Sequence, residues 1–138
     1  MDLVKYYKIV ENCIAKLGVN AEEARAEKPG SWDLSKGSAR VLIDVWYIEK
    51  EERPYIQIMS DVVEIPASDE MKHALFEELL VINDKLFGCA FTLFKEKIWL
   101  KTIRECEGLD ESEAFAMLTR VGNYADEYDD YFQEKYTS

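Results

Sequence analysis

The stretch that decides the fold is PASDEMKHALFEELLVINDKL, residues 66–86. Ser68 suits the N-cap of a helix because its hydroxyl accepts a hydrogen bond from a backbone N–H two or three residues on. Asp69 and Glu70 add negative charge in the first turn, where the helix dipole favours it. Apolar side chains then recur at spacings of three and four, at Met71, Leu75, Leu79, Ile82 and Leu86, and the stripe is widened by Phe76 and Leu80. The pattern predicts a helix that must be covered, with a sheet as its natural cover.

The rest of the chain predicts sheet on both sides of this helix and one further helix at each end. Helical spacing covers residues 2–17 and resumes after a capping box formed by Asp110 and Glu113. β-Branched and aromatic residues mark the predicted strands, at residues 32–34, 40–48, 55–65, 89–94 and 98–105, whereas residues 20–30 are interpreted as a connection. The predicted fold class is α+β, an antiparallel sheet with helices in the order α-β-β-β-α-β-β-α.

Two expectations concern the surroundings of particular residues. Both faces of the strand at residues 40–48 are largely apolar, so this strand is predicted to be central and covered on both sides. Asp44 then needs a partner among apolar neighbours, and Arg40 is the candidate. The acidic residues of the last helix are predicted to face water, at Asp126, Glu127, Asp129 and Asp130.

Length and composition bound the class of protein. The 138 residues are 48% hydrophobic and 33% charged, which is typical of one globular domain over residues 1–138. A formal net charge of −11 makes nucleic acid and anionic membrane surfaces unsuitable partners, because both require a basic surface. The three cysteines include no C-x-x-C pair, and no apolar run approaches the ~20 residues of a membrane span. We therefore expect reduced thiols in a cytoplasmic protein.

Four segments, in their order and spacing, resemble the YbjN and type III secretion chaperone-like (CesT-type) family. Residues 61–66, DVVEIP, are similar to a third strand that runs into a proline before the central helix. Residues 79–83, LLVIN, resemble the Leu-Leu-x-x-Asn near the end of that helix. Residues 88–93, GCAFTL, resemble the glycine-led strand that follows, and residues 121–130 resemble the terminal helix. The resemblance covers most of the chain from about Val41 onward.

This resemblance implies a cytoplasmic, non-enzymatic protein. Secretion chaperones of this fold are usually acidic homodimers, and they hold an extended segment of a client along apolar grooves on the helix-and-sheet surface. YbjN-type members are linked to regulation and stress responses. The partners implied are therefore a protein client and a second copy of the chain.

No pattern in the chain indicates catalysis, and neither a cofactor nor a metal site is expected. The single histidine, His73, falls off the apolar stripe of its helix and is predicted to face solvent. Cys13 and Cys89 are predicted to lie in the core, and the acids beside Cys106 are expected to raise its pKa. Residues 126–130 lack the spacing and glycine of an EF-hand, so a solvated helix face is predicted there rather than a Ca²⁺ site.

Aromatic side chains on the predicted strands are the best candidates for recognition. Most of them are expected to fill the core, and any that form an exposed patch mark a protein-binding surface. Asn83 has two interpretations, a side chain that ties down the turn after its helix and a polar anchor in a client groove. The partner-binding candidates are Trp32, Trp46, Tyr55, Trp99 and Asn83.

The sequence thus predicts a non-enzymatic protein-binding module, chaperone-like or regulatory, that buries an apolar segment of a partner protein. Strand addition and helix-in-groove contact are the two modes considered. The alternative is a small-molecule or ion-binding sensor domain, which requires Arg40, Asp44 and Asn83 to line a deep cavity. An enzyme is the third hypothesis and depends on His73 or one of the cysteines.

Overall fold

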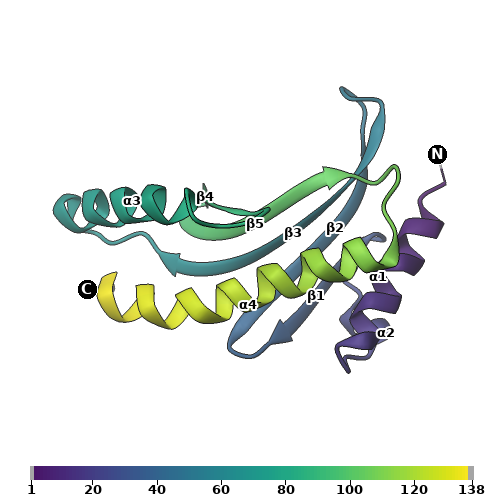
Figure 1. Ribbon diagram of the computed structural model, residues 1–138, viewed down its shortest axis with the longest axis horizontal. Coiled ribbons are helices and arrows are strands. Elements are labelled where there is room, and N and C mark those ends of the chain that lie inside the picture. Colours follow the sequence, from purple (N-terminus) through teal and green to yellow (C-terminus); the bar gives the residue numbers. More distant parts are fainter. Residues whose placement is uncertain (1, 137–138) are drawn as a thin grey trace.

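A five-stranded antiparallel sheet in the order β1-β2-β3-β5-β4 carries the fold in the computed structural model, which describes residues 2–136. In chain order the elements are α1 (Val4–Lys16), α2 (Ala21–Ala24), β1 (Ser31–Lys36), β2 (Ala39–Ile48), β3 (Arg53–Glu64), α3 (Asp69–Asn83), β4 (Ala90–Phe94), β5 (Lys97–Glu105) and α4 (Glu111–Tyr136) (Figure 1). The predicted α+β class and the order of the main elements are confirmed. The short helix α2 lies in the segment that was expected to be only a connection.

The longest helix, α4, forms the centre of the core. It lies across one face of the sheet and contacts β1, β2, β3, β5 and α1 (Figure 1). The predicted capping box is present, since the Asp110 carboxylate accepts from the Glu113 N–H at 2.7 Å and the Glu113 carboxylate accepts from the Asp110 N–H at 3.0 Å. Its buried apolar side chains span the whole helix, at Ala114, Met117, Leu118, Val121, Ala125, Phe132 and Tyr136. The sheet therefore wraps α4, and the prediction that it wraps the middle helix is wrong.

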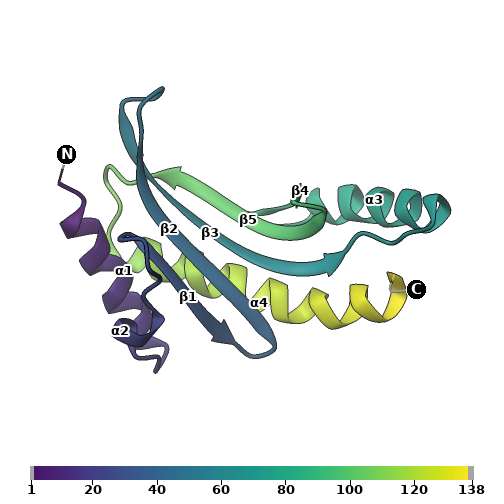
Figure 2. The same cartoon turned by 180° about the vertical axis from the view of Figure 1, so that it is seen from behind.

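Within residues 2–136, no helix lies on the opposite face of the sheet (Figure 2). The side chains of β2 that point toward the helices are at most 2% exposed, namely Ala39, Val41, Ile43 and Val45. The alternate side chains are half-buried, namely Leu42, Asp44, Trp46 and Ile48. The prediction that this strand is covered on both faces is wrong, because its outer side chains are shielded by cross-strand neighbours rather than by a second layer.

Asp44 lies on this open face, and its partner differs from the expected one. Its carboxylate accepts a hydrogen bond from the Ser31 hydroxyl at 2.6 Å, across the β1–β2 pair. Arg40, the expected partner, instead forms an ion pair with Asp33 at 2.8 Å. Each acid therefore pairs with a side chain on the neighbouring strand, as the register of the hairpin dictates.

The turn between β1 and β2 is fastened to α4. The Ser38 N–H and hydroxyl each lie 2.8 Å from the Asp126 carboxylate, and the hydroxyl also lies 2.8 Å from the Asp129 carboxylate. Gly37 has a positive φ of 61°, and a Cβ there would lie 2.5 Å from Asp126. Asp129 is 4% exposed, so the prediction that it faces water is wrong. The hairpin covers this turn of the helix.

Helix α3 lies at the end of the molecule opposite α1 and α2, beside β4 (Figures 1 and 2). The predicted cap is present, since the Ser68 hydroxyl accepts from the Met71 N–H at 3.2 Å. Only Leu75 and Leu79 are buried within this helix. Leu80, which was placed in the apolar stripe, is 71% exposed. Leu80 and Val81 are therefore uncovered, whereas the other apolar residues of the stripe are buried or partly buried against the core, at Met71, Leu75, Phe76, Leu79 and Ile82.

Candidate functional site

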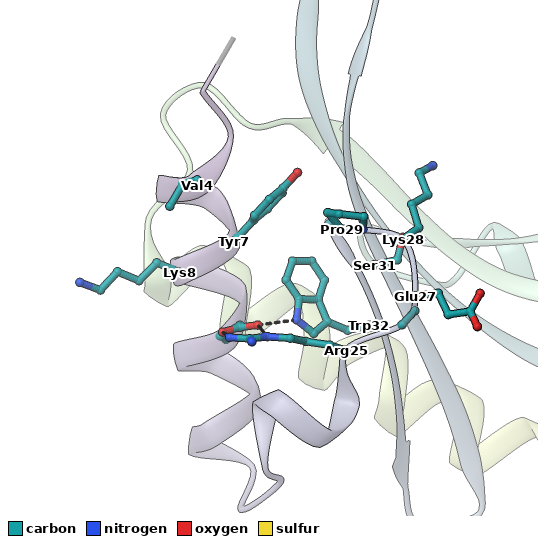
Figure 3. A pocket seen from close by; sticks show the side chains of 12 residues that line it. Val4, Tyr7, Lys8, Arg25, Glu27, Lys28, Pro29, Ser31 and Trp32 are labelled. Carbon is teal, nitrogen blue, oxygen red and sulfur yellow. Dashed lines mark hydrogen bonds and ion pairs between the residues drawn. The ribbon is translucent and has the colours of Figure 1, made fainter.

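A groove of about 590 Å³ runs between α1 and the segment that leads into β1 (Figure 3). We call it the α1 groove. Helix α1 contributes Val4, Tyr7, Lys8 and Glu11 to one wall, and residues 25–32 form the other. The lining is mainly apolar with charged groups at its rim, a combination suited to a polypeptide segment.

Two aromatic rings form the base of the α1 groove. Tyr7 meets Trp32 edge to face, with ring centroids 5.7 Å apart (Figure 3). Gly30 closes the base with a φ of +86°, and a Cβ there would lie 2.6 Å from the Val45 carbonyl oxygen and 3.0 Å from the Tyr7 ring. Because only glycine permits both this φ and this approach, the segment can lie directly against the ring. The base of the groove is therefore formed before any partner arrives.

Glu11 ties the two walls together. Its carboxylate accepts two hydrogen bonds from the Arg25 guanidinium, at 2.6 and 2.7 Å, and one from the Trp32 indole N–H at 2.9 Å (Figure 3). The hydrogen bond from Arg25 is the main reason that the pKa of Glu11 lies below its usual value. Glu11 is thus an ionised anchor that fixes both the loop and the indole ring.

The free edge of the sheet runs on from this groove. β1 is an edge strand. Just before it, the Gly30 carbonyl accepts a hydrogen bond from the Val45 N–H of β2 at 2.7 Å, so these two residues form a hydrogen-bonded pair. Because bonded and non-bonded pairs alternate in an antiparallel ladder, Ser31, Asp33 and Ser35 direct their backbone groups away from β2. The bridge between Arg25 and Trp32 covers the edge as far as Asp33 and leaves the backbone groups of Ser35 open. Within residues 2–136, no further strand pairs with β1 beyond its start. This edge can accept a strand from a partner.

A second apolar surface lies at the other end of the molecule. We call it the α3–β4 patch, and we define it by the large apolar side chains of this region that are between 52% and 73% exposed, at Leu80, Val81, Phe87 and Leu93. A shallow recess of about 270 Å³ lies between the helix and the strand. Leu80 and Leu93 both line this recess, and exposed apolar residues that lie together mark an interaction surface more often than singly scattered ones do.

Asn83 sits in that recess and acts on the backbone of β4. Its carboxamide accepts from the Phe91 N–H at 2.7 Å and donates to the Phe91 carbonyl at 3.4 Å. These are the two backbone groups that Phe91 directs away from β5, so the side chain satisfies them as a neighbouring strand would. The edge of β4 is thereby closed at this residue.

The structure distributes the predicted partner-binding residues over different surroundings. Trp32 is 3% exposed at the base of the α1 groove. Trp46 and Tyr55 lie opposite each other on the open face of the sheet, both half-buried. Trp99 is 9% exposed near the other end of that face, and its indole N–H donates to the Phe94 carbonyl at 3.0 Å. These rings do not form one patch.

The groups considered for chemistry are dispersed as well. Burial raises the pKa of the Cys106 thiol to about 11, against the influence of Arg104, so the acids beside Cys106 are not the cause that raises it. Cys13 is 1% exposed and its pKa is also raised to about 11, mainly by burial, while Cys89 is half-buried. His73 is exposed on α3, as predicted.

The residues on which the sensor hypothesis depended do not share a cavity. Asp44 and Arg40 are engaged in separate pairs on the sheet, and Asn83 binds backbone at the far end of the molecule. Among residues 2–136, no cluster of three or more acidic, histidine or cysteine side chains is placed to hold a metal ion. In the same part of the chain, no helix combines the length and apolarity needed to cross a membrane.

Sequence reasoning missed the walls of the α1 groove and most of the α3–β4 patch. The helical spacing of residues 2–17 does not show that Tyr7 lines a groove, and nothing in the spacing of Glu11 and Arg25 indicates that they meet. For the patch a signal did exist. Val81 and Phe87 are large apolar residues that fall outside the apolar stripe of the predicted helix, so the core does not account for them.

The solved structures that resemble this chain include several protein–protein complexes. A chain of the ExsC–ExsE complex is 17% identical and matches over 97% of this chain and 96% of its own length, with a TM-score of 0.66. A chain of the HopA1–SchA chaperone–effector complex is 9% identical over 94% and 98%, with a TM-score of 0.62. The Yersinia pestis type III secretion chaperone SycH, solved with a fragment of YscM2, is 14% identical over 89% and 98%, with a TM-score of 0.59. At these identities the likeness establishes the fold.

The family follows from the sequence itself. No curated protein matches the chain by sequence. A family model described as "T3SS (YopN, CesT) and YbjN peptide-binding chaperone 1" matches residues 5–137, nearly the whole chain. This confirms the resemblance drawn from residues 61–66, 79–83, 88–93 and 121–130. The chain belongs to the family of type III secretion and YbjN peptide-binding chaperones.

Proposed function

We propose that the protein acts without chemistry and holds an extended apolar segment of a client protein in the α1 groove and along the free edge of β1. The observation that carries this proposal is the juxtaposition of a preformed groove with an unpaired strand edge. The groove supplies an aromatic base, and the edge supplies backbone groups at Ser35, beyond the bridge of Arg25 with Trp32. Family membership and the protein partners named with ExsC, SchA and SycH support it.

The charge of the chain selects among clients. A net charge of −11 favours encounter with segments that carry lysine or arginine beside their apolar residues. The encounter rate should therefore fall as salt is added, while the apolar and backbone contacts persist. A cytoplasmic location fits this role, because a client is held there before it is exported or used.

A second copy of the chain is the partner we propose for the α3–β4 patch. The patch is apolar, and charged residues of both signs are exposed on or next to the same two elements, at Glu77, Lys85 and Lys95. Asn83 closes the β4 edge at Phe91, so side-chain packing rather than sheet extension joins the two copies. The chain then acts as a homodimer with one client groove at each end.

One pair of matched substitutions tests both surfaces. Val4→Asp and Val81→Asp place the same charge at exposed valines, 63% and 52% exposed, in the α1 groove and the α3–β4 patch. Clients captured by the unchanged protein are identified by mass spectrometry, and their binding segments are titrated by calorimetry. Val4→Asp should weaken client binding by about tenfold or more and leave the mass unchanged, because the charge is buried only when the client binds.

Val81→Asp should act in the opposite way. Light scattering should give the unchanged protein twice its 16.1 kDa chain mass, and the variant should fall to one chain mass with client affinity retained. A client that binds both variants equally well would place its site elsewhere and contradict the proposed function. If the unchanged protein has the mass of a single chain, the proposed dimer is contradicted, and the proposal for the α1 groove still stands.

A further inference from the structure

Residues Arg25 and Ala26 separate the α1 groove from the free edge of β1. The Ala26 N–H donates to the Ser31 carbonyl oxygen at 2.9 Å, and Arg25 forms an isolated antiparallel bridge with Trp32. On one side of this pair lies the groove, and on the other side, beyond the bridge, Ser35 presents its free backbone groups. The chain itself thus occupies the position that a client strand would take at the start of β1.

Little burial holds this pair of residues in place. Between residues 21 and 29 only Ala24 is buried, and the preceding helix α2 has four residues. Beside the backbone hydrogen bond of Ala26, the segment is attached by the ion pair of Arg25 with Glu11, whose side chains are 54% and 22% exposed. Segments with few buried contacts and solvent-exposed hydrogen bonds open at low free energy. Residues 25 and 26 therefore form a separable part of the site.

The base of the groove does not depend on this attachment. Trp32 pairs with Ile43 of β2, and its indole N–H donates to Glu11 at 2.9 Å independently of Arg25. Gly30 is likewise held by the Val45 N–H at 2.7 Å. If Arg25 leaves, the aromatic base and the strand edge keep their positions.

We propose that Arg25 and Ala26 form a displaceable gate that divides the client site when the protein is free. When the Arg25–Glu11 pair opens, the α1 groove and the β1 edge join into one continuous track for an extended peptide. This inference rests on the proposed function, whose client site it regulates. The apparent affinity for a long extended peptide is then reduced by the fraction of molecules in which the gate is closed.

Arg25→Ala tests the gate, with Arg53→Ala as its control. Arg53 pairs with Glu105 at 2.8 Å and is similarly exposed, but it lies away from the α1 groove. The probe is a fluorescein-labelled nine-residue peptide of alternating valine and threonine with a lysine at each end, titrated by fluorescence anisotropy. Amide exchange at Ala26 is followed by nuclear magnetic resonance in the same samples.

The gate predicts two changes that occur together. In Arg25→Ala the Ala26 amide should exchange faster while amides in the β1–β2 ladder stay protected, and the probe should bind about three- to tenfold more tightly. Arg53→Ala should leave both unchanged. In the unchanged protein, saturating probe should remove the protection of Ala26. Glu11→Gln, which keeps an acceptor for Trp32, should act in the same direction as Arg25→Ala and serves if that variant is unstable.

The failures are distinguishable. If the unchanged protein and Arg25→Ala bind the probe with equal affinity, the gate is contradicted and the proposed client site still stands. The same holds if the Ala26 amide stays protected when the unchanged protein is saturated with probe. Weaker binding by Arg25→Ala and Glu11→Gln also overturns it, because the segment then contributes to the bound state. If the probe binds neither the unchanged protein nor Arg25→Ala, although the Ala26 amide exchanges faster in Arg25→Ala, then both the proposed strand-edge site and the gate are contradicted.

Discussion

Helices α3 and α4 look alike in sequence and are used in opposite ways. Both begin with a side-chain cap and both carry an apolar stripe at helical spacing. Helix α4 buries its stripe against the sheet over its whole length, whereas α3 buries only Leu75 and Leu79 and leaves Leu80 and Val81 in solvent. The comparison teaches that an apolar stripe indicates that a helix needs cover, but not whether the same chain provides it.

The position of each helix along the sheet explains the difference. Helix α4 lies over the middle of the sheet, where four strands and α1 surround it. Helix α3 lies at the β4 edge, where its main sheet contact is the five-residue strand β4. At this edge the end of α4 also contacts the helix, through Tyr136 and Glu78, while Leu80 and Val81 remain available to another molecule.

The largest expected effect comes from matched phenylalanines at the two helices. Phe132 on α4 is 0% exposed among the rings of Phe91 and Tyr128, whereas Phe87, just after α3, is 73% exposed. Phe132→Ala should lower the free energy of unfolding by about 3–5 kcal/mol through the cavity it leaves. Phe87→Ala should change it by less than about 0.5 kcal/mol. Urea denaturation of dilute protein measures both, and equal losses would show that α3 is covered as fully as α4.

A smaller effect is expected at the link between α3 and β4. Asn83→Ala removes both hydrogen bonds to the backbone of Phe91, which is 8% exposed, and should cost about 1–3 kcal/mol. Asn83→Asp keeps an acceptor for the Phe91 N–H and loses the donor, so its free energy of unfolding should lie between those of the unchanged protein and Asn83→Ala. The same urea titrations rank the three proteins. Unchanged stability in Asn83→Ala would mean that α3 is held at this edge by apolar packing alone.

The smallest effect concerns the polar contact between the two helices and depends on pH. Burial by itself raises the pKa of Glu78, but hydrogen bonds from Tyr131, Tyr136 and Lys135 outweigh it, and the net pKa is lowered from 4.5. The stabilisation is therefore fully present above pH 4.5 and is lost as the pH falls through the lowered value. Glu78→Gln should cost about 1 kcal/mol at neutral pH and reduce the loss of stability in acid.

Unfolding free energies measured between neutral and acidic pH test that expectation. Glu77→Gln is the control, because Glu77 is the neighbouring residue on α3 and faces solvent beside His73. It should leave the pH dependence unchanged. If Glu78→Gln retains the full acid sensitivity of the unchanged protein, the lowered pKa of Glu78 does not stabilise the contact between α3 and α4.

Local features of the fold were predictable because they depend on near neighbours in the chain. The Ser68 cap, the Asp110/Glu113 capping box and the period-two alternation of β2 all follow from residues within a few positions of one another. The resemblance that indicated a protein-binding chaperone was likewise carried by short segments. The surroundings of Asp44 and Asp129 were mispredicted because their partners, Ser31 and Ser38, are distant in sequence.

The candidate site was the least predictable part. Of the five predicted partner-binding residues, Trp32 lies at the base of the α1 groove and Asn83 in the recess of the α3–β4 patch. Glu11 and Arg25 meet across 14 residues, and no periodicity links them. A groove is made by the surfaces of two elements that pack side by side, so neither element alone contains its signature.

The sequence by itself determined that this chain forms an antiparallel α+β domain of the secretion-chaperone type, because capping, side-chain period and segment order are written in neighbouring residues. Only the tertiary structure decided which helix fills the core, which face of the sheet stays bare, and where a groove meets a free strand edge. The physical reason is that burial is a property of pairs of elements. An apolar stripe states a requirement for cover, and the topology of the sheet determines whether the chain or a partner meets it.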